Sequence, residues 1–117
     1  MQFVLLIYHG TSPLPGSASW KALSDVEHKA IYAEYAELNK AEGITLRLPP
    51  LAPDKATTVQ VRDGKPQVKN GPHLGEGVGG AFVLEAEDLE AAIALAARIP
   101  QARLGGAVEI RPVEKYF

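Results

Sequence analysis

Apolar and polar positions follow two different periods along the chain, and these periods predict a mixed fold. Residues 2–8 form a nearly unbroken apolar run of β-forming residues, typical of a central strand that is buried on both faces. Residues 57–62 alternate strictly, with Val59 and Val61 on one face, which predicts a strand with one polar face. Shorter β-forming runs predict the remaining strands at 44–50, 65–69, 79–86 and 106–117.

Two helices are predicted from their caps and apolar stripes. Ser24 and Glu27 form an S-x-x-E capping box, and Gly43 supplies the glycine that ends the first helix. The second helix is expected to start after Asp88 and to stop at Pro100. Its buried stripe is expected to comprise Leu89, Ala92, Ile93 and Ala96.

The order of these elements predicts one α+β domain over residues 1–117. It is the split βαβ, ferredoxin-like plan, with a β-hairpin added around the Asp63-Gly64 turn. Two helices cover only one face of such a sheet, so the apolar residues on the other face need a partner. A second copy of the chain is the economical partner, and we expect a homodimer with a barrel-like interior. Leu5 and Val59 are expected to line its interface.

Composition narrows the classes of function. The 117 residues carry a net charge of −2, so the chain has no general basic field to attract nucleic acid. No apolar run reaches the roughly 18 residues that a membrane helix requires. The chain has no cysteine, which excludes disulfides and thiol nucleophiles and is compatible with a reducing cytoplasm. We therefore expect a cytoplasmic protein that binds neither nucleic acid nor membrane.

Four segments carry a family resemblance. In chain order they are FVLLIYHG, VRDGKPQVKNGP, GGAFVLEAEDLEAAIALAARIP and VEIRPV. Together they resemble the YCII-related, or DGPF-domain, proteins. The resemblance implies a dimeric α+β barrel without a single established reaction, and a site built from a histidine and a carboxylate. Because some members are encoded beside sigma factors, it also implies an alternative role, a non-catalytic regulatory or interaction module linked to transcription.

The chain departs from the family at the motif that gives the family its name. Where Asp-Gly-Pro-Phe is usual, this chain has Asn70, Gly71, Pro72 and His73. The glycine and the proline preserve a rigid corner, but an amide cannot act as the base that a carboxylate would provide. His73 is a candidate acid–base group because imidazole titrates near neutral pH. The alternative is a polar side chain that only replaces the phenylalanine in packing.

The candidate catalytic residues are His9, His73 and Glu76. His9 ends the first strand, and Glu76 matches the glutamate that precedes the family's double glycine. We expect all three to meet in a pocket between residues 9–19 and 70–77, where a histidine–glutamate pair would serve small-molecule acid–base chemistry. The plainer alternatives are that His9 is a solvent-facing loop histidine, that His73 is only a turn residue and that Glu76 is a solvated charge.

Four further residues are candidates for ligand binding: Tyr8, His28, Arg62 and Arg111. The two arginines suit bidentate binding of a carboxylate in a dimer cleft, with surface ion pairs as the alternative. His28 loosely resembles a helix histidine of some family members, with a partly buried structural residue as the alternative.

Neither a metal nor a cofactor is expected. The histidines lack H-x-x-x-H spacing, although ligation by histidines together with Glu76 stays open. The stretch GEGVGG precedes a strand and not a helix, so it is not a dinucleotide cradle.

Overall fold

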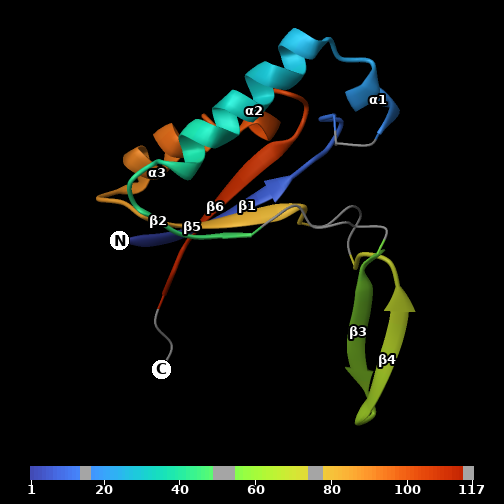
Figure 1. The fold of residues 1–117 in the computed structure, drawn as a ribbon. Coiled ribbons are helices and arrows are strands. Elements are labelled where there is room, and N and C mark those ends of the chain that lie inside the picture. Colours follow the sequence, from blue (N-terminus) through green and yellow to red (C-terminus); the bar gives the residue numbers. More distant parts are fainter. Residues whose placement is uncertain (14–16, 49–54, 74–77, 115–117) are drawn as a thin grey trace.

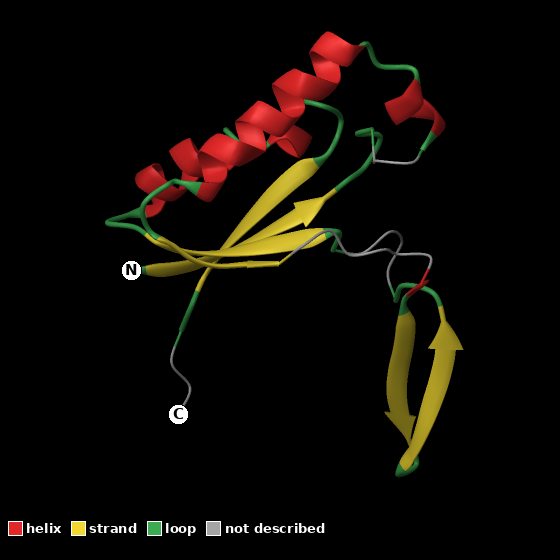
Figure 2. Ribbon diagram, viewed as in Figure 1, coloured by secondary structure: helices red, strands yellow, loops and turns green. Residues whose placement is uncertain are grey.

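The computed structural model describes residues 1–13, 17–48, 55–73 and 78–114 (Figure 1). Its elements are β1 (Gln2–Tyr8), α1 (Ala18–Lys21), α2 (Asp25–Asn39), β2 (Ile44–Leu48), β3 (Thr57–Arg62), β4 (Lys65–Asn70), β5 (Gly80–Glu85), α3 (Leu89–Ala96), the 3₁₀ turn η2 (Pro100–Ala102) and β6 (Ala107–Pro112). Strands β2-β5-β1-β6 form an antiparallel sheet in that order, with α2 and α3 on one face (Figure 2). The predicted α+β, ferredoxin-like fold is confirmed.

Strand β1 alternates between a fully covered face and a less covered one. Phe3, Leu5 and Ile7 are buried, and Leu5 has no exposed surface. Val4 and Leu6 are only half-buried, because the helices lie on the other face of the sheet. The expectation that Leu5 lines the uncovered face was therefore wrong. The apolar residues of β1 on that face are Val4 and Leu6.

The predicted N-terminal cap of α2 is confirmed, but the helix ends at Asn39 with Lys40 as its C-cap, so Gly43 does not end it. The Ser24 hydroxyl accepts a hydrogen bond from the Glu27 amide at 3.1 Å, and the Glu27 carboxylate accepts one from the Ser24 amide at 3.3 Å. These two bonds satisfy two of the amide groups that have no partner at a helix N-terminus.

The buried stripe of α3 differs from the predicted one. Ala92 and Ala96 are buried as expected, and Leu95 joins them, so one helix face is covered. Leu89 and Ile93 are exposed, which corrects their assignment to the core. The side chains at 92, 95 and 96 form a narrow stripe that faces the sheet. Residues 89 and 93 lie outside this stripe, and a helix this short covers no wider face.

The short helix α1 was not expected, because residues 9–19 contain mainly turn-forming residue types. Ser17 starts it by accepting a hydrogen bond from the Trp20 amide at 3.2 Å. Four residues carry too little periodicity to reveal a helix in sequence. Among the described helices, none is both long enough and apolar enough to cross a membrane.

Strands β3 and β4 form a hairpin that extends away from the main sheet (Figure 1). Its turn has positive φ at both Asp63 and Gly64, as an Asp-Gly turn of this class requires. On one face Val59 pairs with Val68, and Val61 pairs with Pro66.

All three valines on that face are exposed. A two-stranded hairpin is marginally stable alone, so this apolar face is a surface that lacks a partner within the described chain.

Candidate active site

His9 continues the alternation of β1 beyond its last residue and lies on the helix side of the sheet, like Ile7. Its side chain is buried, with 5% of its surface exposed. Nε2 lies 3.2 Å from the carbonyl oxygen of Gly79. Because a carbonyl only accepts, Nε2 carries the proton of the neutral ring, which leaves a lone pair on Nδ1. Nδ1 is buried and has no hydrogen-bond partner among the described residues.

A tight turn holds the His9 backbone. The carbonyl oxygen of His9 accepts hydrogen bonds from both the amide and the hydroxyl of Ser12, at 2.9 and 2.6 Å. The Gly79 amide donates to the carbonyl oxygen of Ile7 at 2.7 Å, which brings the start of β5 against the imidazole. The ring is thus fixed from both its backbone and its Nε2 side.

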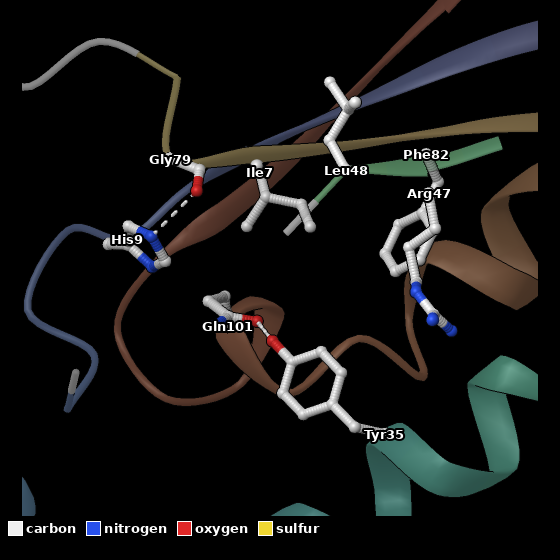
Figure 3. A pocket seen from close by; sticks show the side chains of 9 residues that line it. Ile7, His9, Tyr35, Arg47, Leu48, Gly79, Phe82 and Gln101 are labelled. Atoms are coloured by element: carbon white, nitrogen blue, oxygen red, sulfur yellow. Dashed lines mark hydrogen bonds between the residues drawn. The ribbon is translucent and has the colours of Figure 1, made fainter. Parts of the chain in front are cut away.

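A small pocket opens beside this imidazole (Figure 3). It encloses about 100 Å³ and has a mainly apolar wall. Its lining consists of Ile7, His9, Tyr35, Arg47, Leu48, Gly79, Gly80, Phe82 and Gln101. The residues come from β1, α2, β2, β5 and η2, together with His9 directly after β1 and Gly79 directly before β5. The pocket therefore forms where the sheet and the helix layer meet.

Tyr35 and Gln101 form a hydrogen-bonded pair in the pocket wall. The Tyr35 hydroxyl donates to Oε1 of Gln101 (Figure 3). Burial raises the pKa of Tyr35 above its ordinary value and outweighs the hydrogen bond to Gln101, which lowers it; the carboxylate of Glu34 also raises it. The phenol is therefore protonated at neutral pH and acts as a donor. With its oxygen engaged, the amide of Gln101 has its NH₂ group left as a donor.

The structure does not bring His73 together with His9. His73 is exposed and is not among the residues that line the pocket. It lies two residues after Gly71, which makes two hydrogen bonds. The Gly71 amide donates to the carbonyl oxygen of Ala56 at 2.8 Å, and the Gly71 carbonyl oxygen accepts from the Thr58 hydroxyl at 2.7 Å. These bonds attach the corner to the base of the hairpin and not to the sheet edge that holds His9. Gly71 has φ of +107°, in agreement with a glycine corner.

Glu76 lies outside the described residues. In the rest of the chain that the structure describes, no group of three or more histidine, cysteine, aspartate or glutamate side chains is placed to hold a metal ion.

Tyr8 and Arg111 lie on the sheet face that no helix covers. The Tyr8 hydroxyl and Nη2 of Arg111 both donate to Oε2 of Glu109, each at 3.1 Å. Desolvation and the Glu109 carboxylate raise the pKa of Tyr8, so its hydroxyl stays protonated at neutral pH. This polar cluster faces away from the pocket and belongs to the uncovered surface.

His28 and Arg62 lie away from the pocket as well. The His28 ring stacks on Trp20 with centroids 4.4 Å apart, and its Nε2 donates to the Trp20 carbonyl oxygen at 2.6 Å. These contacts join α1 to α2, which is a structural role. Arg62 is exposed and lies on the polar face of the hairpin, opposite Val59 and Val61.

Sequence reasoning missed Tyr35, Arg47 and Gln101 as pocket residues. Tyr35 follows the apolar period of α2 and resembles a core residue in sequence. Gln101 is a lone amide after a proline. Arg47 falls in a short strand where the side that it faces depends on a bulge. None of the three carries a sequence motif, and only folding brings them together.

Substitution of Gly79 by alanine is expected to displace His9. A Cβ atom at Gly79 would overlap Cδ2 and Nε2 of the buried ring. We expect a loss of stability of about 1–3 kcal/mol, since added atoms in a packed interior force neighbours out of their positions. Chemical denaturation measures this loss. A variant as stable as the parent, with unshifted His9 resonances, would show that the ring is not held against Gly79.

Comparisons with known proteins found a matching family model and a similar solved structure. The family model described as the YCII-related domain matches residues 1–116. A solved structure of 5-chloro-2-hydroxyhydroquinone dehydrochlorinase from Burkholderia phenoliruptrix AC1100, in complex with 2,5-dihydroxybenzoquinone, is 17% identical to this chain. That alignment covers 97% of this chain and 94% of the other, with a TM-score of 0.46. No curated protein matches the chain significantly.

Proposed function

Because the chain belongs to the YCII-related domain family, we propose that it binds a small molecule beside His9 and uses this imidazole as a proton acceptor. One observation carries the proposal: Nδ1 of His9 is buried without a partner among the described residues, in a side chain that lines a pocket. A buried polar atom without a hydrogen-bond partner costs free energy. A ligand that donates a hydrogen bond to Nδ1 removes this cost, which favours binding.

The surroundings of His9 suit general-base chemistry. When Nδ1 takes a proton from a ligand, the ring becomes positively charged, and its Nε2–H bond to Gly79 becomes charge-assisted and stronger. The buried side chains of Ile7 and Phe82 form an apolar part of the wall, and an apolar environment strengthens electrostatic interactions. The fixed ring needs little reorganisation to accept the proton.

The proposal is tested by NMR with fragments of fewer than about ten non-hydrogen atoms, a size that suits a small pocket. We expect fragments with an O–H or N–H donor to shift the resonances of His9 and of the Ile7 and Leu48 methyl groups. His9→Phe should abolish these shifts, whereas His73→Phe, a matched change at an exposed histidine, should retain them. Binding that survives unchanged in His9→Phe, or that maps to the corner at His73, refutes the proposal.

We also propose that the chain forms a homodimer through the uncovered sheet face. Val4, Leu6 and Val83 are half-buried there and Leu46 is exposed, although they form a continuous apolar surface over β1, β5 and β2. The exposed valines of the hairpin form a second apolar surface on the same chain. A second copy would cover both kinds of surface symmetrically.

Sedimentation velocity at micromolar concentration tests the dimer, with Leu6→Asp as the disrupting variant. A carboxylate at this position would replace an apolar side chain of the proposed interface and would add a like charge directly beside Glu109, so we expect the variant to sediment as a monomer. Val26→Asp is the control, because Val26 is exposed on α2, away from the sheet. A parent protein that is monomeric throughout this concentration range would exclude the dimer.

We also propose a cytoplasmic location, because a chain without cysteine is compatible with a reducing compartment. The alternative of a regulatory module linked to transcription receives no support from the comparisons.

A further inference from the structure

A register shift in β2 brings Arg47 to the pocket. Ile44 pairs with Leu84 and packs on the helix-side core, so uninterrupted alternation would direct Arg47 to the opposite face. The register shifts between Ile44 and Leu46, and Arg47 consequently pairs with Phe82, a buried core residue. A one-residue shift reverses the face of every following side chain. Arg47 therefore lies on the helix side of the sheet, where it lines the pocket.

Arg47 is the cation of this pocket. Apart from the titratable ring of His9, no other side chain in the described lining carries a charge. Glu34, the carboxylate that acts on the pocket residue Tyr35, is paired with Arg103. No ion pair or hydrogen bond engages the guanidinium of Arg47 within the described ranges. Its five donors remain available for a ligand.

Arg47 and His9 lie on opposite sides of the pocket (Figure 3). The two groups therefore address two ends of one ligand: a planar cation at one end and a hydrogen-bond acceptor at the other. Arg47 is exposed at the open edge of the pocket, so a ligand can reach its guanidinium, which binds carboxylates with two parallel hydrogen bonds. The Gln101 NH₂ group adds a neutral donor in the wall between them.

We infer that the ligands of this pocket are small carboxylates that carry a second group with a removable proton. Arg47 holds the carboxylate, and the second group, a hydroxyl, an amine or an acidic C–H, donates to Nδ1 of His9. The inference rests on the proposed function, since it names the ligand class of the same pocket. Arg47 sets specificity, and His9 receives the proton.

A matched pair of probes tests the charge requirement: 3-hydroxypropanoate and its amide, 3-hydroxypropanamide. The two compounds share size and hydroxyl group and differ in the negative charge. Binding is measured by NMR titration of the full chain. We expect the carboxylate to bind at least about tenfold more tightly than the amide, as a charge-assisted bidentate pair provides. Arg47→Gln should remove this preference, so that the variant binds the two probes with similar affinity.

Arg62→Gln is the matched control, because Arg62 is an exposed arginine on the hairpin. It should bind both probes like the parent. Equal binding of the two probes by the parent, or an unchanged preference in Arg47→Gln, overturns the inference. The outcome is distinguishable from failure of the proposed function: if His9→Phe abolishes binding of both probes while Arg47→Gln alters neither, the His9 site stands and the carboxylate assignment alone is lost.

Discussion

Replacement of Gly106 by alanine should lower the free energy of unfolding by about 3 kcal/mol, the upper range for added volume at a packed site. A Cβ atom there would overlap the carbonyl oxygen of Tyr8 and would lie 2.8 Å from that of His9 and 3.0 Å from that of Gln101. All three are backbone atoms, so no side-chain rotation relieves the crowding. The backbones of two polar pocket residues meet at this glycine, and the substitution should therefore weaken ligand binding as well.

Gly80→Ala is the control for this prediction. Its Cβ atom would lie 3.6 Å from Cδ1 of Ile7, an ordinary van der Waals distance. Its stability in urea should therefore remain close to that of the parent. If Gly106→Ala unfolds at the same urea concentration as Gly80→Ala, the close approach of β1 and η2 at this point is not present in solution.

Leu5→Ala should cost about 2–5 kcal/mol of stability, the range for removing a leucine side chain from a closed core. Leu5 has no exposed surface and lies among Phe3, Ile7 and Phe82. The strands on both sides of β1 are held to it by backbone hydrogen bonds, so the core cannot collapse fully into the vacated space. Denaturant unfolding monitored by circular dichroism measures the loss.

Leu6→Ala makes the same chemical change one residue further along β1, on the face without helices. At low protein concentration, where a dimer is dissociated, its cost should be much smaller than that of Leu5→Ala. At high concentration its cost should rise, because the proposed second copy covers this face. Equal costs for the two variants at low concentration would show that the two faces of β1 are buried alike in a single chain.

The fold could be predicted from sequence because its signals are local. The alternation in 57–62, the capping box at Ser24 and the Asp-Gly turn each specify a structure within a few residues. The face that each β1 residue would occupy was not predictable in the same way, since an unbroken apolar run fits both faces. Leu5 was misplaced for that reason.

The site was less predictable because it depends on contacts between distant segments. His9 was found from its position at a strand end, and the structure places it in a pocket. His73 was predicted as a site residue because it alters a family motif. In the structure, the preceding Gly71 is hydrogen-bonded to the base of the hairpin, away from the pocket. Arg47 reaches the pocket through a register shift with no signature in the sequence. Gln101 can be recognised as a pocket residue only from the folded structure, in which η2 packs beside β1.

The protonation of the His9 ring in solution tests the central claim most directly. A long-range ¹H–¹⁵N spectrum, recorded where the ring is neutral and assigned with His9→Phe, reports which nitrogen carries the proton. The structure predicts a protonated Nε2 bound to Gly79 and an unprotonated Nδ1 whose resonance shifts when a small hydrogen-bond donor enters the pocket. A proton on Nδ1, or an Nδ1 resonance that no pocket ligand moves, would contradict the assignment of His9 as the proton acceptor.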